Sequence, residues 1–242
     1  MKAYKKDHLE SYTAGVFVTL ELLNHHLEDC TRVILHSKGM KNQGVQKILA
    51  ICEASHIPYE INDRQTEKLS HKENCYAIGV FRKYPCQLMP GKNHVVLVNP
   101  GDMGNLGTIM RTMVGFGMED LAIIRPGVDA YDPKVIRASM GSIFHLRFAY
   151  FDDFETYLQQ YPRKVYCLML KGATNLAKTR FEKPYALVFG NESSGLPDEF
   201  LQYGQSVLIH HTDKIDSLNL SMALGITLYE ATRETMGRDD DA

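Results

Sequence analysis

Three polar segments that contain glycine hold most of the side chains that could do chemistry in this sequence. They are Asn99–Arg111, Gly190–Pro197 and Ile209–Asn219. Each follows an apolar stretch typical of a strand, and ligands bind at the carboxyl ends of strands in open α/β sheets. Amide, hydroxyl and carboxylate groups can orient a substrate by hydrogen bonds, and a guanidinium can hold a phosphate bidentately. The candidate residues of these kinds are Asn105, Arg111, Glu192, Ser217 and Asn219.

The glycines of the first segment argue against two common cofactor loops. They stand at positions 101, 104 and 107, which is not the Gly-x-Gly-x-x-Gly spacing of dinucleotide-binding loops. Arg125 stands at the end of the next predicted strand, where such loops are followed by an acidic residue. No Gly-Lys-Ser/Thr sequence follows, so a phosphate-binding P-loop is also disfavoured. A nicotinamide-dependent enzyme is therefore the least favoured interpretation.

Each candidate residue also has an ordinary structural interpretation. Asp216 or Ser217 could cap the last predicted helix, which would leave Asn219 in its first turn. Glu192 could be an exposed residue of a strand-to-helix turn. Arg111 lies among apolar residues of a predicted helix, so we expect it to be largely buried, where an unpaired guanidinium is costly.

We expect neither a metal site nor a membrane segment. His210 and His211 are adjacent, but neighbouring strand residues face opposite ways and no third ligand is suitably spaced. The five cysteines are scattered without a Cys-x-x-Cys pair, which is typical of reduced thiols in a cytosolic protein. No run of about 18 apolar residues is present, and the first ten residues are polar. We therefore expect a cytoplasmic protein.

The elements that must position the polar segments alternate between strand and helix. We predict strands over 94–99, 185–189 and 205–210, and helices over 106–116 and 217–234. Continuous apolar strands that alternate with helices predict an α/β fold with a mostly parallel sheet covered on both faces.

A smaller α/β region precedes these elements. Residues 8–29 have apolar positions at helical spacing, and short strands are predicted around 33–35, 57–62 and 75–81. Two prolines and a glycine within 84–91 predict a linker. We therefore divide the chain into an N-terminal domain, 1–89, and a larger domain, 90–242.

The charge balance excludes a general nucleic-acid coat protein. The 242 residues include 27 Lys and Arg against 29 Asp and Glu, which gives a formal net charge of −2. This balance provides no broad cationic field but permits a local RNA or DNA site. The candidate phosphate contacts in the N-terminal domain are Arg32, Lys38, Lys41 and Lys47.

Taken together, the three segments resemble the three motifs of a known enzyme family. The matching residues are Asn105-x-Gly107-x-x-x-Arg111-Thr112, Gly190-Asn191-Glu192-x-x-Gly195-Leu196 and Ser217-Leu218-Asn219-x-Ser221-x-Ala223, with Arg137–Ser142 between the first two. They resemble the motifs of the SpoU/TrmH family, which are RNA 2′-O-ribose methyltransferases of the SPOUT superfamily. The N-terminal domain resembles the L30e-like substrate-binding domain that many members carry.

This resemblance implies a fold, a cofactor and an assembly. It implies a deep trefoil knot in the C-terminal domain and a homodimer whose active site is completed across the interface. The implied cofactor is S-adenosylmethionine, held largely by backbone groups of Gly190, Ile209 and Leu218. The implied functional polar set is Asn105, Arg111, Glu192, Ser217 and Asn219. The role of Arg111, as a base or as a phosphate anchor, stays open.

The sequence departs from the family pattern after the last predicted strand. The family usually has Ile-Pro-Met there, whereas this chain has Ile209-His210-His211. The alternative function is therefore a non-catalytic RNA-binding protein that keeps the knotted dimer as a scaffold. Family members that act on tRNA generally lack the extra N-terminal domain, so the resemblance favours rRNA over tRNA as the substrate.

Overall fold

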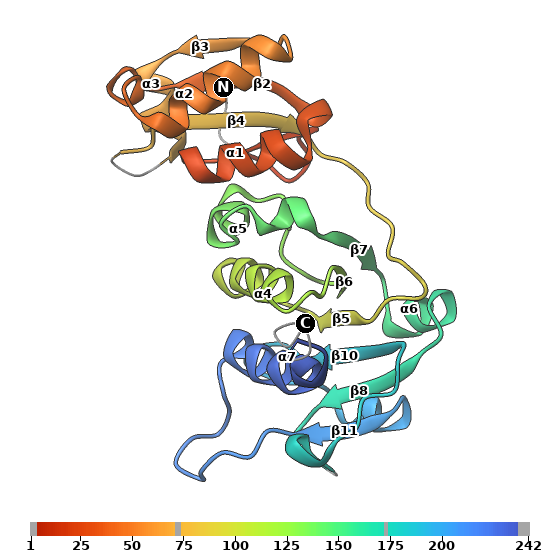
Figure 1. The fold of residues 1–242 in the computed structure, drawn as a ribbon. Coiled ribbons are helices and arrows are strands. Elements are labelled where there is room, and N and C mark those ends of the chain that lie inside the picture. Colours follow the sequence, from red (N-terminus) through yellow and green to blue (C-terminus); the bar gives the residue numbers. More distant parts are fainter. Residues whose placement is uncertain (1–3, 71–73, 172–173, 237–242) are drawn as a thin grey trace. The chain divides into compact units, whose positions relative to one another are not determined.

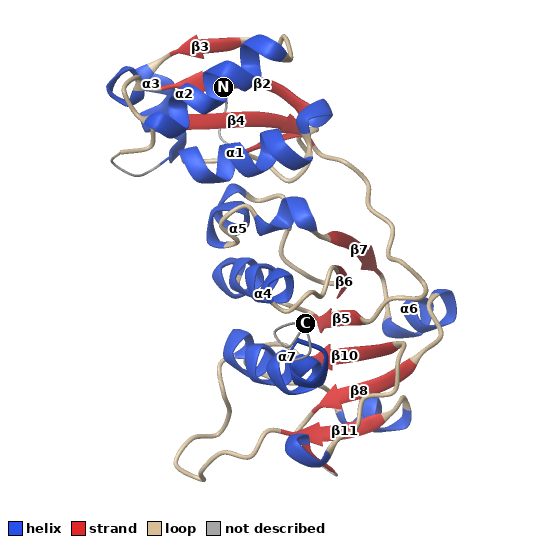
Figure 2. Cartoon of the chain, in the orientation of Figure 1, coloured by secondary structure: helices blue, strands red, loops and turns tan. Residues whose placement is uncertain are grey.

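The chain forms two compact units in the computed structural model, which describes residues 4–70, 74–171 and 174–236. The first unit comprises Met1–Pro85 and Asp129–His145, and the second comprises Cys86–Val128 and Leu146–Ala242. Figure 1 labels most of the elements of both units along the chain, and Figure 2 distinguishes their helices from their strands. The predicted domains, 1–89 and 90–242, stay a prediction.

The second unit contains a seven-stranded sheet in the order β7-β6-β5-β10-β8-β11-β9. All of its neighbouring strands are parallel, as expected for continuous apolar strands that alternate with helices. The mixed α/β class predicted from the sequence is confirmed. The strands are β5 (His94–Val98), β6 (Asp120–Ile124), β7 (Arg147–Phe151), β8 (Lys164–Leu168), β9 (Thr174–Asn175), β10 (Tyr185–Phe189) and β11 (Gln205–Leu208). The helices are α4 (Met103–Gly115), α6 (Phe154–Gln160) and α7 (Leu220–Met236).

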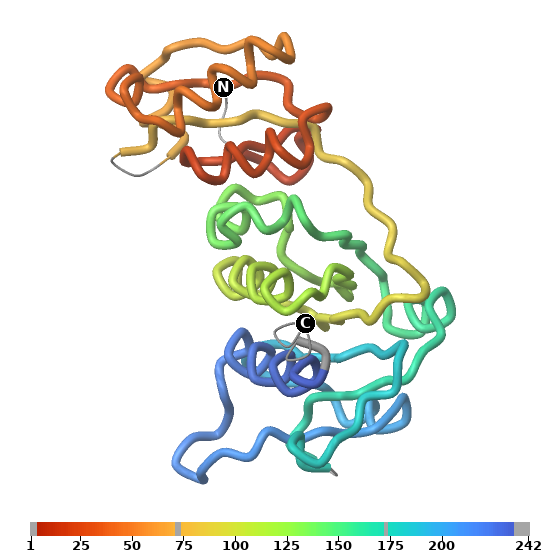
Figure 3. The backbone as a smooth tube through the Cα atoms, in the orientation of Figure 1, coloured from red at the N-terminus to blue at the C-terminus, as the bar shows by residue number. Residues whose placement is uncertain are grey.

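Helices cover both faces of this sheet. Val96 and Val188 belong to a buried cluster that includes Phe154 and Tyr157 of α6. Alternate residues of a strand face opposite sides, so Val95 and its equivalents in the other strands face away from α6. On that side α4 and α7 pack against each other. Figure 3 follows the chain from β11 through residues 209–219 into α7. The trefoil knot itself stays a prediction, with which this strand order is compatible.

Buried polar groups lie at the amino ends of β5 and β6. His94 is fully buried, and its ring nitrogens lie 3.0 Å from the Tyr157 hydroxyl and 2.9 Å from the Met89 carbonyl oxygen. Burial lowers the pKa of His94 to about 4. Asp120 is also fully buried and pairs with Arg147, whose Nη2 lies 2.6 Å from its carboxylate. These pairs satisfy the groups that the core encloses.

The first unit is built on a four-stranded sheet in the order β1-β4-β2-β3. Strands β1 and β2 are antiparallel to β4, and β3 is parallel to β2. The strands are β1 (Glu10–Tyr12), β2 (Cys30–Leu35), β3 (Tyr59–Ile61) and β4 (Ala77–Arg82). The helices are α1 (Val16–His25), α2 (Gln43–Ala54), α3 (Asp63–Ser70) and α5 (Pro133–Ala138).

The helix predicted over 8–29 is wrong at its start. Residues Glu10–Tyr12 form β1, in which Tyr12 pairs with Val80 of β4. Gly15 then adopts a φ of +119°, which favours glycine, and α1 begins at Val16. Pairing with a distant strand therefore overrides the helical spacing of the apolar residues.

The segment Asp129–His145 packs within the first unit, although it follows the first polar segment in sequence. The Ser11 hydroxyl donates to the Tyr131 carbonyl, and the ring centroids of Phe81 and Phe144 are 5.4 Å apart. His145 Nε2 lies 2.6 Å from the Glu21 carboxylate. The Arg137–Ser142 stretch of the family resemblance lies in this segment.

Two expectations about the chain's environment bear on the fold. None of the helices that the structure describes is long and apolar enough to cross a membrane. All five cysteines are described, none is in a disulfide, and four of them are buried.

Candidate active site

The second polar segment forms a tight turn directly after β10. An added Cβ at Gly190 would lie 2.1 Å from the carbonyl carbon of Gly195, so only glycine fits there. Gly195 has a φ of +67° and bridges back to Asn191. The Asn191 side-chain oxygen accepts hydrogen bonds from the Ser193 backbone (2.9 Å) and hydroxyl (2.7 Å). These contacts fix the turn from which Glu192 projects.

The Glu192 carboxylate binds the start of α4. It accepts hydrogen bonds from the backbone N–H groups of Gly101 (3.0 Å) and Asp102 (3.2 Å). It also accepts one from Asn105 Nδ2 at 3.4 Å. Asn191 Nδ2 donates to the Asn99 carbonyl at 2.7 Å and to Glu192 at 3.3 Å. The second segment therefore holds the first in place through a half-buried carboxylate.

The third polar segment joins the same network through Asn219. Its Nδ2 donates to Asn105 Oδ1 at 3.2 Å. Asn105 thus accepts from Asn219 and donates to Glu192, so one residue from each of the three segments contributes to a continuous hydrogen-bonded chain. This chain brings together three of the five polar residues predicted to form a site.

Asn219 is the cap of α7, which corrects the sequence prediction. Helix α7 begins at Leu220, and Asn219 Oδ1 accepts from the backbone N–H groups of Ser221 (2.9 Å) and Met222 (3.3 Å). The prediction placed Asp216 or Ser217 at the cap and Asn219 inside the first turn. An asparagine is as good a cap as aspartate or serine, so residue type alone does not select among them.

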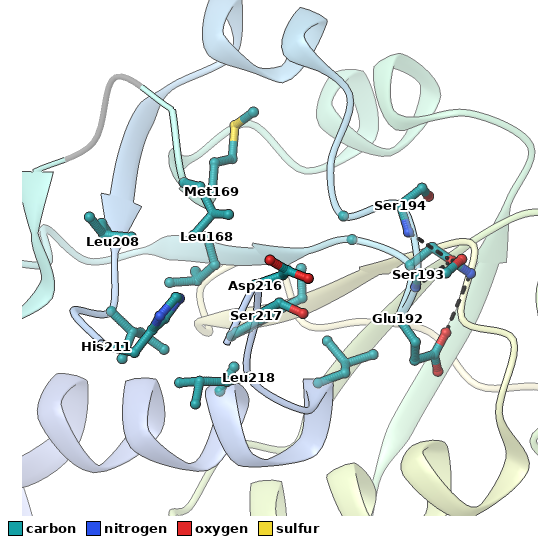
Figure 4. Close-up of a pocket in the computed structure, with 18 of the residues that line it drawn as sticks. Leu168, Met169, Glu192, Ser193, Ser194, Leu208, His211, Asp216, Ser217 and Leu218 are labelled. Atoms are coloured by element: carbon teal, nitrogen blue, oxygen red, sulfur yellow. Dashed lines mark hydrogen bonds between the residues drawn. The ribbon is translucent and has the colours of Figure 1, made fainter. Parts of the chain in front are cut away.

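A pocket of about 300 Å³ opens beside the hydrogen-bonded chain formed by Glu192, Asn105 and Asn219. It lies at the carboxyl ends of β8, β10 and β11. Its size is at the lower end of the range for small-molecule sites. The three residues predicted to bind a cofactor, Gly190, Ile209 and Leu218, all line it. Ser217 and Glu192 line it too (Figure 4). Four of the five predicted polar residues therefore lie at this pocket or in the hydrogen-bonded chain beside it.

Arg111 is the exception. It is exposed, whereas its neighbours Ile109, Met110 and Met113 are fully buried. The expectation of a largely buried Arg111 is therefore wrong, because the side chain falls on the solvent face of an otherwise buried helix. It has no hydrogen bond or ion pair within the part of the chain that the structure describes. Six residues along an α-helix also turn Arg111 about 120° away from Asn105.

Two positioning residues were missed from the sequence. Asp102 caps α4, and its side chain accepts from the Asn105 backbone N–H at 2.7 Å. Asn191 ties the turn to the end of β5, as described above. The signal for Asp102 was present, since an aspartate just before an apolar periodic stretch is typical of a helix start.

The two histidines after β11 have different surroundings. His210 is exposed, while His211 is half-buried and lines the pocket. Neither belongs to a cluster of three potential metal ligands among the described residues. Such clusters occur in the first unit, at Glu21/His25/His145 and at His26/Glu28/Asp29. No metal site was predicted from the sequence, and that prediction stays untested.

Comparison with known proteins identifies the family. The sequence model of the SpoU rRNA methylase family matches residues 92–229, which is more than half of the chain. The chain belongs to the SpoU rRNA methylase family. All eight residues predicted for the site lie inside the matched range, and so do Asp102 and Asn191.

Relatives of this SpoU family member match different shares of its length. An uncharacterised tRNA/rRNA methyltransferase of Synechocystis sp. is 32% identical over 144 residues, which are 58% of this chain and 53% of that protein. The chain thus matches about half the length of that relative. A Listeria innocua protein named for tRNA (cytidine(34)-2′-O)-methyltransferase activity is 33% identical over 149 residues, covering 59% of this chain and 88% of its own.

A solved structure covers nearly the whole chain. The rRNA methyltransferase of Sinorhizobium meliloti bound to S-adenosylmethionine superposes with a TM-score of 0.77 at 25% identity. The superposition covers 94% of this chain and 88% of that one. It therefore includes counterparts of both units.

Proposed function

We propose that this SpoU family member transfers a methyl group from S-adenosylmethionine to the 2′-hydroxyl of a ribose in RNA. The observation that carries the proposal is the pocket lined by Gly190, Ile209 and Leu218, with the chain Glu192–Asn105–Asn219 at its side. A small-molecule pocket next to polar hydrogen-bonding groups suits a cofactor beside a polar substrate. The sequence-based expectation of a cytoplasmic location belongs to the same proposal.

The residues of the pocket fit the proposed cofactor. Leu168, Leu208 and Leu218 offer apolar surface for a nucleoside base. Glycine at 190 keeps the turn close to the pocket, because any side chain there would collide with the Gly195 backbone. When bound, S-adenosylmethionine supplies an electrophilic methyl group. The support for this cofactor is the pocket together with the bound molecule in the S. meliloti structure.

The polar residues would hold the substrate rather than perform difficult chemistry. Methyl transfer needs the 2′-oxygen in line with the methyl group, and such positioning alone lowers a barrier substantially. Asn105 has a second N–H and a second lone pair beyond those used by Glu192 and Asn219, and these could bind a ribose hydroxyl. Ser217 offers a hydroxyl at the same pocket. Arg111 would bind the adjacent phosphate bidentately or receive the hydroxyl proton.

A homodimer is part of the proposal. Helix α7 exposes Met222, Ile226 and Tyr229, with 61%, 40% and 62% of their surfaces accessible, on one face at helical spacing. Exposed apolar patches of this kind mark interaction surfaces. Arg111 is exposed and turned away from Asn105 of its own chain. We therefore assign Arg111 to the active site of the partner subunit.

Ribosomal RNA is the favoured substrate. The match with the Listeria innocua relative, which is named for action on tRNA, covers 59% of this chain and 88% of the relative's own length. The S. meliloti rRNA methyltransferase matches 94% of the chain, including the first unit. A substrate-binding role for the first unit is consistent with the exposure of Lys38, Lys41 and Lys47. Arg32, in contrast, is half-buried and paired with Glu10 at 3.4 Å.

Two experiments test the proposal. Mapping of ribose methylation in total RNA from a deletion strain should find one missing 2′-O-methyl group in rRNA, restored by the wild-type gene. An unchanged map, or a missing base methylation, would contradict the reaction. Calorimetry with S-adenosylmethionine tests the alternative of a non-catalytic RNA-binding protein, for which a folded dimer would show no binding.

Mixed dimers test the assignment of Arg111. Each of the variants Arg111→Ala and Asn105→Ala should be folded and nearly inactive. When the two are refolded together, half of the dimers are mixed, and each mixed dimer regains one intact site. Activity should therefore return to about one quarter of the wild-type value. If Arg111 acts within its own subunit, mixing restores nothing.

A further inference from the structure

His211 lines the pocket and carries a buried polar atom that accepts and donates no hydrogen bond among the described residues. Its Nε2 is buried and has no hydrogen-bond partner among the described residues. Its Nδ1 lies 3.0 Å from the Thr212 carbonyl oxygen. Buried polar atoms in folded proteins are nearly always paired, so this one indicates a ligand group.

The contact with Thr212 determines what kind of group that is. A carbonyl oxygen only accepts hydrogen bonds, so His211 Nδ1 must carry the proton of this bond. In a neutral imidazole the other nitrogen is then a lone-pair acceptor. The partner of His211 Nε2 must therefore be a hydrogen-bond donor.

The neighbours of His211 indicate which kind of ligand carries this donor. Figure 4 shows His211 beside Leu208 and Leu218, at the opposite end of the pocket from Glu192. Leucine side chains suit the faces of a flat aromatic ring, and the edge of such a ring needs polar partners. An aromatic ring with an amino group at its edge satisfies both conditions.

We propose that His211 Nε2 accepts a hydrogen bond from the exocyclic amino group of the cofactor's adenine, and so favours adenine over hypoxanthine, which has a carbonyl oxygen in that place. This inference rests on the proposed cofactor. His211 is then a specificity residue that acts on binding, at a distance from the hydrogen-bonded chain that holds the ribose. The exposed neighbour His210 has no part in it.

The test measures affinity for two ligands by calorimetry. The ligands are S-adenosylhomocysteine and its inosyl analogue, in which a carbonyl oxygen replaces the amino group. The variants are His211→Phe, which keeps a flat ring without the acceptor, and His211→Gln, which keeps an acceptor. His210→Phe is the matched control, and thermal unfolding verifies that each variant is folded.

We expect His211→Phe to weaken S-adenosylhomocysteine binding about fivefold to tenfold, the value of one neutral hydrogen bond. Its affinity for the inosyl analogue should change much less. His211→Gln should recover part of the preference for adenine, and His210→Phe should match the wild type.

Other outcomes would overturn the inference in distinguishable ways. If the wild type binds S-adenosylhomocysteine and His211→Phe binds it equally well, the inference fails and the proposed function stands. If His211→Phe weakens both ligands equally, the amino group is not the partner. If the folded wild type binds neither ligand, the inference and the proposed cofactor fail together.

Discussion

Glu192 provides the sharpest test of how the three segments are held together. Each of its two carboxylate oxygens accepts a backbone N–H of the α4 start, at 3.0 and 3.2 Å, and each also accepts a side-chain N–H, from Asn191 or Asn105. In Glu192→Gln one oxygen becomes an NH₂ group, which only donates. Whichever way the amide turns, one backbone N–H then faces a donor.

The cost follows from these contacts. One charge-assisted hydrogen bond is lost, and the other becomes neutral and weaker. Glu192 is half-buried and water can reach part of the site, so each hydrogen bond contributes at the low end of the usual range. The free energy of unfolding should therefore fall by about 2 kcal/mol. For a protein of this size that lowers Tm by about 4–8 °C. Because the same turn lines the pocket, affinity for S-adenosylhomocysteine should fall about tenfold.

The assay compares Glu192→Gln with Glu199→Gln, an exposed glutamate whose side chain has no hydrogen bond among the described residues. Unfolding in urea can be followed by circular dichroism, since the chain has no tryptophan. Glu199→Gln should behave as the wild type. Equal stability and equal affinity in the two variants would refute the conclusion that Glu192 holds the start of α4 in place.

Three further predictions concern the second unit. Arg147→Met should lower the free energy of unfolding by about 3 kcal/mol, because it leaves the buried carboxylate of Asp120 without its cationic partner. Arg125→Met, which breaks an exposed ion pair, should cost less than about 1 kcal/mol, and equal losses in urea unfolding would contradict this reasoning. Because the folded pKa of His94 is about 4, below the unfolded value near 6.5, the unfolded state binds the extra proton first. The free energy of unfolding should therefore fall by up to about 3 kcal/mol as the pH drops from 6.5 to 4, and His94→Gln should flatten this slope. Gly190→Ala should lower the free energy of unfolding in urea by more than about 2 kcal/mol and abolish S-adenosylhomocysteine binding. The reason is that the new methyl group would overlap the Gly195 backbone. A variant with wild-type stability and affinity would contradict this close approach.

Local patterns predicted the elements that carry the site. Strand β10 has the predicted bounds, because its apolar stretch is short, continuous and bounded by Pro184 and Gly190. The carboxyl ends of parallel strands lie at one edge of the sheet, so the polar residues that follow β5, β10 and β11 come together. That rule placed Asn105, Glu192 and Asn219 near one another without any knowledge of their contacts.

The errors arose where a distant or alternative partner decided the outcome. Strand β1 exists because Glu10–Tyr12 pairs with β4, about seventy residues away, and no local pattern contains that information. Arg111 was expected to be buried because its neighbours are apolar, but a helix can bury one face and expose the next residue. Strand β7 was not predicted, since its sequence is mixed in polarity and it lies at one end of the sheet order.

The helix cap and the polar chain constrain each other. Asn219 Oδ1 is occupied by two N–H groups of α7, so its amide nitrogen must point at Asn105. Asn105 must then present its oxygen to Asn219 and its nitrogen to the Glu192 carboxylate, which cannot donate. The start of α7 therefore determines the orientation of both amides, up to the carboxylate that holds the start of α4. A site whose polar groups have only one consistent arrangement is preorganised, which is the property that the proposed in-line transfer to a ribose hydroxyl would require.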